Sequence, residues 1–353
     1  MSKRVNIYYA GFSHRVGGAF HHVVNLKKGM EEQGFSVNVI TLDSIPLIFR
    51  YIPHIIQLIG NFINFPMGFL YKQKVIRYFY SLKYKNSCDI EIFEDIYTYW
   101  SSNTISIVIL HALWSDNLQA FNAGEQRRKK LEKKETRIIN KIHSPIITVS
   151  EPYKKFILSR LNPFDLNKNI DVIELGIDIN KFKKAIKNNN SILFVGSLEA
   201  RKNILFLLKV YKLLQAKSNN KYSLTIVGDG PQKTELKEFA KGNNLKKLNI
   251  LGRLSYDEVI SEMPKHTYYV HTSLKESFSY ALLEAKLSGL ITIAYSKLQV
   301  PKEFIDIKMG SFDENQWVQK IESGQGHNNK FENHQFSYRI MTQRTIDKLH
   351  LNV

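Results

Sequence analysis

Two kinds of spacing between apolar residues alternate along this chain of 353 residues. Residues 5–10 form a short apolar run that predicts a strand, and residues 19–33 carry apolar side chains near a 3.6-residue period, which predicts a helix. Residues 36–42 alternate as the next strand would, and Gly34 stands where a helix is expected to end. A strand–loop–helix–strand unit of this kind implies a parallel sheet.

The same alternation returns after residues 187–190, a polar stretch typical of a linker. Strands are expected at 192–195, 223–227, 248–251, 268–271 and 290–294, and helices at 203–214, 231–241, 255–263 and 281–288. The first half adds strand patterns at 90–93, 105–110 and 146–149 and a charged helix at 125–141. This order predicts an α/β fold with two doubly wound, Rossmann-like domains, residues 1–182 and 183–335. A C-terminal helix at 336–353 is expected to pack back on the first domain.

The net charge of the chain indicates which classes of partner it binds. Fifty Lys and Arg against 32 Asp and Glu give a formal charge of +18, which favours nucleic acid, an acidic membrane or phosphorylated small molecules. The sequence has no zinc-ligand spacing and no RNA-recognition signature, so nucleic acid is the weakest of the three. The single cysteine, Cys88, fits a reducing compartment, and the first residues read as a strand rather than a secretion signal. We therefore expect a cytoplasmic protein.

Residues 45–71 form the most apolar stretch, but polar residues and prolines interrupt every window long enough to span a membrane. Five basic residues follow, interleaved with aromatic ones: Lys72, Lys74, Arg77, Lys83 and Lys85. This pattern predicts a segment that lies on an anionic membrane surface, at the inner face of the cell membrane. The alternative is a set of buried helices.

Three loops that open helices are candidates for binding an anion. The first ends in Gly17 and Gly18, where the absence of side chains lets a ligand approach backbone N–H groups at a helix N-terminus. It does not match the dinucleotide fingerprint G-x-G-x-x-G. The second spans residues 196–203 and places Arg201 and Lys202 at the entrance of a helix, where a diphosphate would meet two positive charges.

The third loop follows the strand at 268–271 and carries two glutamates, Glu276 and Glu284. With a helix starting near Ser279, Glu276 lies in the loop and Glu284 about one and a half turns into the helix, so that both could face one cleft. One carboxylate would accept two ribose hydroxyls and the other would contact a sugar. The backbone N–H groups of residues 278–280 would bind phosphate or sugar oxygens.

Taken together, these stretches resemble family 4 glycosyltransferases, which have the GT-B architecture and retain the anomeric configuration. The resemblance rests on FVGSLEARKN (194–203), TIVGDGPQKTEL (225–236), ILGRLSYDEV (250–259), HTSLKESFSYALLEAKLSGL (271–290), VIELGIDINKF (172–182) and VGGAFHHVVNLKKGMEEQGFSVNVIT (16–41). It is poor across residues 47–103. It implies two facing domains with a cleft between them and a nucleotide-sugar donor held mainly by the second.

The resemblance also implies roles for individual residues. Glu284 matches a ribose-binding glutamate, Glu276 a glutamate near the donor sugar, Lys202 a lysine on the diphosphate, and His111 a histidine that touches the donor sugar. The catalytic set expected on this basis is His111, Lys202 and Glu276. The donor-binding set is Gly17, Gly18, Ser197, Arg201, Arg253, Ser277, Phe278, Ser279 and Glu284, with Arg253 beside the base and Gly18 near the donor phosphate.

Two positions depart from the family pattern. Ser197 stands where the family usually has an arginine, and residues 294–301 replace a glycine-containing loop that precedes a glutamate, a place that Glu303 could take. Weak donor binding or loss of activity is therefore one expectation.

The remaining expectations concern the reaction. Without a D-x-D motif we expect transfer without a metal or other cofactor, from a UDP-sugar rather than a GDP-sugar, by front-face substitution. The expected acceptor is a saccharide or a lipid-linked saccharide in cell-surface glycan synthesis. The alternatives are a sugar-nucleotide isomerase or hydrolase, an inactive partner subunit that keeps the fold, and a nucleic-acid binder.

Overall fold

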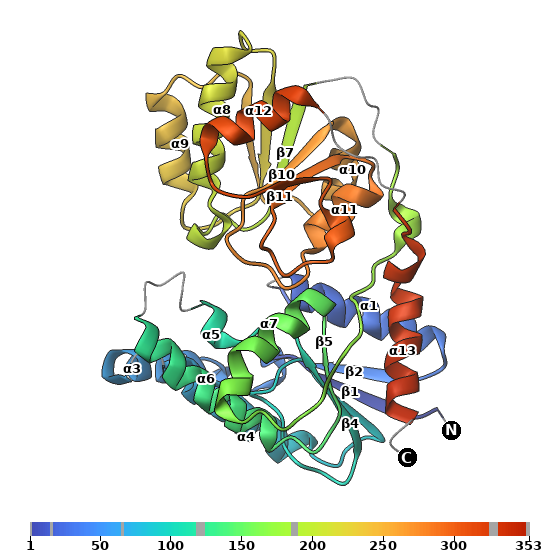
Figure 1. The fold of residues 1–353 in the computed structure, drawn as a ribbon. Helices are drawn as coiled ribbons and strands as arrows, with labels where there is room; N and C mark the ends of the chain where they lie inside the picture. The colour runs from blue at the N-terminus through green and yellow to red at the C-terminus, as the bar shows by residue number, and fades with distance from the viewer. Residues whose placement is uncertain are drawn as a thin grey trace. The chain divides into compact units, whose positions relative to one another are not determined.

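The computed structural model describes residues 2–14, 17–64, 67–117, 124–184, 190–324 and 331–350. The chain divides into two compact units, each a parallel sheet covered by helices (Figure 1). Unit 1 comprises Met1–Asp178 and His334–Val353, and unit 2 comprises Ile179–Asn333. The prediction of two Rossmann-like domains is confirmed.

Unit 1 contains a six-stranded parallel sheet with the strand order β2-β1-β3-β4-β5-β6. Its strands are β1 (Arg4–Tyr8), β2 (Ser36–Ile40), β3 (Ile90–Phe93), β4 (Ile105–Leu110), β5 (Ile146–Thr148) and β6 (Ile170–Val172). The order reverses between β1 and β3, because β2 pairs on one side of β1 and every later strand adds on the other. The strand patterns at 90–93, 105–110 and 146–149 are confirmed, whereas the three-residue β6 is too short to show a period.

The helices of unit 1 are α1 (Gly18–Glu32), α2 (Leu47–Arg50), α3 (Ile52–Asn64), α4 (Gly68–Tyr84), α5 (Trp114–Asn117), α6 (Glu125–Asn140), α7 (Glu151–Leu161) and α13 (Tyr338–His350). The apolar stripe of α1, Val23, Leu26 and Met30, is fully buried in the unit 1 core. Helix α13 packs against α1, and the Tyr338 hydroxyl donates a hydrogen bond to Glu32 (2.6 Å). The C-terminal helix thus belongs to unit 1.

Unit 2 contains a second six-stranded parallel sheet, with the order β12-β11-β10-β7-β8-β9. Its strands are β7 (Ser191–Val195), β8 (Ser223–Val227), β9 (Leu248–Gly252), β10 (Tyr268–His271), β11 (Ile291–Tyr295) and β12 (Ile307–Met309). Its helices are α8 (Ile204–Lys217), α9 (Lys233–Gly242), α10 (Tyr256–Glu262), α11 (Tyr280–Leu287) and α12 (Glu314–Ser323). Numbered from β7, this is the Rossmann order 3-2-1-4-5-6, which reverses between β7 and β10.

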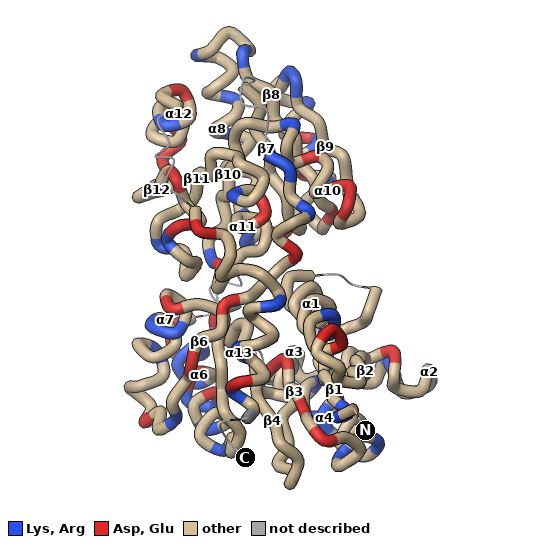
Figure 2. The backbone as a smooth tube through the Cα atoms, turned by 90° about the vertical axis from the view of Figure 1, so that its right-hand side faces the viewer, with Lys and Arg blue, Asp and Glu red and all other residues tan. Residues whose placement is uncertain are grey.

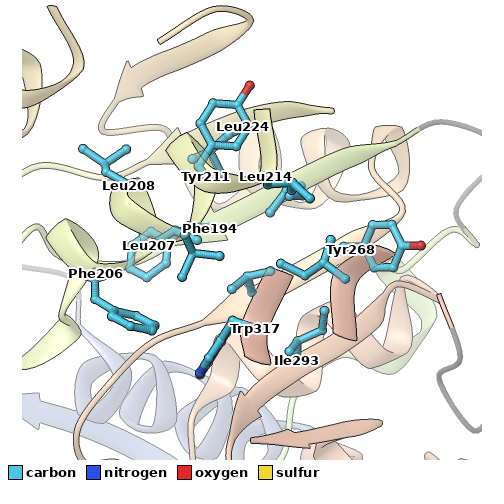
Figure 3. Close-up of a cluster of buried hydrophobic side chains, with 14 of the residues drawn as sticks. Phe194, Phe206, Leu207, Leu208, Tyr211, Leu214, Leu224, Tyr268, Ile293 and Trp317 are labelled. Carbon is cyan, nitrogen blue, oxygen red and sulfur yellow. The ribbon is translucent and has the colours of Figure 1, made fainter. Parts of the chain in front are cut away.

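The core of unit 2 lies where α8 and α12 cover the sheet (Figure 3). Trp317 of α12 is fully buried, and its ring meets that of Phe206 edge-on at 78°, with centroids 5.4 Å apart. The indole N–H donates to the Ser311 carbonyl (2.8 Å), so the polar atom of the ring is satisfied. Truncating a side chain in this position typically costs about 3–5 kcal/mol. Apolar residues recur along α8, and they contribute much of this buried cluster.

Candidate functional site

The switch point of unit 2 is formed by the loops that follow β7 and β10. Open α/β sheets bind ligands at such a point, beyond the carboxyl ends of the strands. The first loop carries Arg201 and Lys202, and the second carries Glu276. Backbone and side-chain hydrogen bonds fasten the two loops together, from Leu274 N to the Arg201 carbonyl (2.9 Å) and from Thr272 Oγ1 to the Lys202 carbonyl (2.9 Å).

The Lys202 ammonium forms an ion pair with Glu276 Oε1, and both side chains are almost buried. The same oxygen lies 3.2 Å from His271 Nε2 and 3.8 Å from the Arg201 guanidinium. Burial alone would raise the pKa of Glu276, but Lys202, His271 and Arg201 outweigh it and hold that pKa well below its usual range. The site therefore holds a carboxylate in contact with three nitrogen groups. The two predicted catalytic residues of unit 2 are brought together.

His271 is a residue of this candidate site that was not predicted from the sequence. It is fully buried at the end of β10, with Nδ1 3.1 Å from the Tyr269 hydroxyl and Nε2 on Glu276. Burial lowers its pKa, so that the ring is neutral near pH 7. The sequence feature that could have indicated His271 is a polar residue at the end of an otherwise apolar strand.

The loops after β7 and β8 touch through glycines. A Cβ on Gly228, whose φ is +146°, would lie 1.8 Å from the Gly196 carbonyl oxygen, and one on Gly230 would lie 2.6 Å from that of Leu198. The Gly196 N–H donates to Val227 (3.0 Å), and the Leu198 N–H donates to Asp229. These glycines, the GDG of residues 228–230, set the path of the loop that carries Lys202.

Ser197, the residue found in place of the usual arginine, lies half-buried in this same loop. The second departure has a structural role in this protein. The backbone N–H of Gln299 donates to the Glu276 carbonyl (3.0 Å), and Leu298 and Val300 are buried. Residues 294–301 thus support the Glu276 loop, while Glu303 lies in the short 3₁₀ helix Lys302–Phe304.

The residues between the two glutamates shape the start of α11. Phe278 is buried against Phe304, with ring centroids 5.2 Å apart, so its side chain anchors the loop. Ser279 has a left-handed backbone (φ 69°) and caps α11, its hydroxyl accepting from Leu282 N (3.4 Å). Ser277 is half-buried between Glu276 and this anchor.

Glu284 is buried in the second turn of α11 and has different partners from Glu276. Burial raises the pKa of its carboxyl to about 7, and a hydrogen bond from Tyr256, the first residue of α10, partly offsets this effect. Arg253 is exposed just before α10 and acts electrostatically on Asp229, whose pKa is lowered chiefly by the Gly230 N–H. Glu284 and Arg253 therefore flank the same helix start, that of α10.

Three predicted residues belong to unit 1. Gly17 has an extended backbone at the N-cap of α1, and a Cβ there would meet nothing within 4 Å. Gly18, the first residue of α1, is exposed as well. His111 directly follows β4, and its Nε2 lies 2.7 Å from Glu94 Oε2.

Glu94 joins two histidines beyond the carboxyl ends of β1, β3 and β4. The same oxygen, Oε2, lies 3.0 Å from Nδ1 of His22 on α1. Burial would raise the pKa of Glu94, but His22 and His111 outweigh it and hold that pKa at about 2, while burial lowers the pKa of His111. Neither His22 nor Glu94 was predicted from the sequence, and no metal site was expected. The residues are far apart in the chain and become neighbours only through the strand order.

Comparison with known proteins agrees with this architecture. A family model described as Glycosyltransferase Family 4 matches residues 16–181, and one described as Glycosyl transferases group 1 matches residues 176–322. Two parallel doubly wound sheets are the GT-B fold, which the structure of HepE from Anabaena shares. The chain belongs to the family 4 glycosyltransferases, as the sequence resemblance predicted.

Individual relatives are distant. The gpi3 subunit of a phosphatidylinositol N-acetylglucosaminyltransferase from Schizosaccharomyces pombe is 30% identical over 40% of this chain and 31% of its own length. An uncharacterized glycosyltransferase from Haemophilus influenzae is 28% identical over 47% of this chain and 46% of its own. The matches thus span less than half of these relatives. The structure of HepE from Anabaena in complex with UDP-glucose has a TM-score of 0.67 at 15% identity and covers 99% of this chain and 100% of its own.

Proposed function

We propose that this protein is a retaining glycosyltransferase that transfers a hexose from a UDP-sugar to a saccharide or lipid-linked saccharide. The observation that carries the proposal is the contact between Lys202 and Glu276 at the switch point of unit 2, with Arg201 beside it. Two cations and an ionised carboxylate stand where a doubly wound sheet binds the phosphates of a nucleotide.

The diphosphate leaves with increasing negative charge during transfer. Lys202 and Arg201 stabilise that charge, and a leaving phosphate oxygen accepts the proton of the acceptor hydroxyl. With two fixed cations at the diphosphate, this step proceeds without a metal ion there. Ser197 leaves the loop one cation short of the family pattern, which lowers donor affinity more than it changes the chemistry.

The nucleoside part of the donor is assigned to the start of α10 and to α11. Glu284 accepts the two ribose hydroxyls, and Arg253 lies beside the base. UDP is favoured over GDP because HepE, with the same fold, has been crystallised with UDP-glucose and with UDP. From unit 1, Gly17 and Gly18 are assigned to the donor phosphate and His111 to the donor sugar.

The proposed location of the protein is the surface of a membrane, at the inner face of the cell membrane. Helix α3 turns apolar side chains to solvent, with exposed fractions of 71% for Leu58, 94% for Phe62 and 75% for Ile63. The buried-helix alternative for residues 45–71 is therefore wrong for this face of α3.

Glycines fix the orientation of that face. A Cβ on Gly60 of α3 would lie 2.8 Å from the Gly68 Cα of α4, so the two helices pack backbone to backbone. Basic residues recur along α4 (Figure 2). An apolar face beside a row of cations is the pattern of a helix that lies in the interface of an anionic bilayer. Among the described residues, none of the helices is long and apolar enough to cross a bilayer.

The test is a panel of UDP- and GDP-sugars, measured first by thermal stabilisation and then by product formation with lipid-linked and free saccharides. A ligand at 100 times its Kd stabilises the folded state by about 2.7 kcal/mol. UDP-sugars should stabilise wild type and the exposed-lysine control Lys212→Ala alike, and Lys202→Ala much less. Release of UDP at the same rate with and without every acceptor would instead indicate a hydrolase or isomerase.

Ser197 stands where the family usually has an arginine, and this replacement favours a second candidate function. The protein would then be a partner subunit that keeps the fold without activity. In that case no sugar nucleotide stabilises the protein, and the same panel decides between the two functions.

A further inference from the structure

The cluster of His22, Glu94 and His111 in unit 1 has the composition of a metal site. Their candidate ligand atoms all lie within 4.8 Å of one another. His22 is 2% exposed and Glu94 4%, whereas the His111 side chain keeps 15% of its surface open. The three residues come from α1, from the end of β3 and from the end of β4, so regular elements hold all of them in place.

One atom of the cluster lacks a partner. Both histidines meet Oε2 of Glu94, while its Oε1 is buried and has no hydrogen-bond partner among the described residues. A buried oxygen of a charged group that has no hydrogen-bond partner destabilises the folded state. A cation bound by both carboxylate oxygens would satisfy Oε1, which hydrogen bonds to Oε2 do not.

The donor set selects the kind of cation. Two imidazoles and a carboxylate suit Zn²⁺ and related transition-metal ions, whereas Mg²⁺ and Ca²⁺ prefer oxygen ligands only. Zinc–ligand bonds of about 2.0–2.1 Å in a tetrahedron place ligand atoms roughly 3.3 Å apart. The observed separations are 3.0 Å for His22 and 2.7 Å for His111, measured to Glu94 Oε2. Compared with that spacing, the two nitrogens lie closer to Oε2 by about 0.3 and 0.6 Å, so each ring has to move away from this oxygen to admit the ion.

We propose that His22, Glu94 and His111 bind one divalent transition-metal ion of the zinc class. Three protein ligands leave one coordination position, and it lies on the half-open His111 side, where a water or a substrate hydroxyl takes it. The ion would share His111 with the donor-sugar contact proposed above, whereas the diphosphate site proposed for unit 2 has no residue in common with it. The existence of the metal site does not depend on the proposed function.

The test uses the full chain, stripped with a chelator and measured without any sugar nucleotide. Calorimetric titration with Zn²⁺ should show one ion per chain, and Co²⁺ should give the visible absorption of a four-coordinate complex. His22→Asn and Glu94→Gln should each weaken zinc binding by at least about 10-fold, a loss that follows even from changing a hydrogen-bond partner of a metal ligand.

The matched control is His266→Asn in unit 2. That histidine is also buried and also contacts a glutamate, Glu262 at 3.1 Å, and its replacement should leave zinc binding unchanged. Absence of stoichiometric Zn²⁺ and Co²⁺ binding by the folded wild type overturns the proposal and leaves a carboxylate that accepts hydrogen bonds from two imidazoles. Binding that persists at full strength in both ligand variants overturns it as well. Because wild-type binding alone can refute the site, variants that fail to fold leave the test decisive.

Discussion

The Lys202 ammonium and the Glu276 carboxylate form an ion pair across two neighbouring strands, although 74 residues separate them in the chain. Lys202 follows β7 and Glu276 follows β10, and these strands lie side by side at the switch point. The resting site therefore already contains an anion on the lysine that is assigned to the donor diphosphate. An incoming phosphate has to share Lys202 with Glu276.

Lys202→Ala should reduce kcat for glycosyl transfer more than it weakens binding of the free nucleoside, because the lost charge acts on the leaving diphosphate. It should also destabilise the fold by about 3–5 kcal/mol, since Glu276 remains buried without its partner. Adding Glu276→Gln to Lys202→Ala should restore part of the melting temperature and none of the turnover. Equal losses for nucleoside and nucleoside diphosphate binding would remove Lys202 from this role.

Glu284→Gln should lower kcat/KM for the donor by about 10- to 150-fold, the equivalent of a hydrogen bond to a charged group, roughly 1.5–3 kcal/mol. In wild type, donor KM should rise about tenfold per pH unit well below pH 7, because only the ionised carboxylate accepts both ribose hydroxyls and the pKa of Glu284 is about 7. The variant should lose this dependence. Steady-state kinetics between pH 5.5 and 8 provide the check, with a loss below about threefold counting against ribose binding.

The same carboxyl links stability to pH in the donor-free protein. An unfolded glutamate releases its proton near pH 4.5, and folded Glu284 releases it near a pKa of about 7. Between these values folded Glu284 binds more protons than unfolded Glu284, so its contribution to the free energy of unfolding falls as pH rises from about 4.5 to 7 and then stays low. The free energy of unfolding of Glu284→Gln should therefore exceed that of wild type by up to about 3 kcal/mol at pH 8 and equal it near pH 4.5. A constant difference across this range would contradict the raised pKa.

Gly228→Ala should destabilise unit 2 and impair donor binding together. The new Cβ would lie 1.8 Å from the Gly196 carbonyl oxygen at a φ of +146°, so the loop leading to Lys202 must shift. We expect a loss of about 1–3 kcal/mol. Gly242→Ala is the matched control, because nothing lies within 4 Å of its Cβ and it ends helix α9 at ordinary φ, where alanine is the better helix former. Chemical denaturation and UDP-sugar titration of both variants measure the two effects.

Membrane docking should depend on both charge and the apolar face of α3. Replacing the five basic residues of residues 72–85 (Lys72, Lys74, Arg77, Lys83 and Lys85) with Gln should abolish co-sedimentation with anionic vesicles at physiological salt, since each contributes about 1 kcal/mol near an acidic surface. Phe62→Ser should weaken it at every salt concentration.

The control for docking changes the same number of exposed lysines in unit 2, namely Lys209, Lys212, Lys237, Lys246 and Lys320. This variant carries the same net charge as the first and should still bind. Sedimentation that ignores lipid charge, or that falls equally in both variants, would contradict docking through α3 and α4.

The sequence predicted the two sheets well because strand and helix periods are local properties. Lys202, Glu276 and Glu284 could be proposed as site residues for the same reason, since each lies at or just after a recognisable strand-to-helix turn. Their partners were not found, because His271 reaches Glu276 only through the path of the loop after β10. His22 and Glu94 meet only because β1 and β3 pair directly, a choice of strand order that no local pattern contains.

Residues 45–71 show the opposite limit. Their apolar pattern could not separate packing from exposure, because both need the same residues. The glycine contact between α3 and α4 decides it: Gly60 and Gly68 bring one face of α3 against α4 and leave Phe62 and Ile63 outside.

Helix α13 has a consequence for the order in which this protein is made. Unit 1 is discontinuous: α13 closes over α1, and Ile177 pairs with Ser337 across an intervening unit 2. Residues 1–178 leave the ribosome before α13 has been synthesised, so the face of α1 that α13 covers is still exposed at that stage. Unit 2, in contrast, emerges as one continuous segment. The later-made unit can therefore finish its core first. Unit 1, although its synthesis starts first, completes its core only after α13 has emerged.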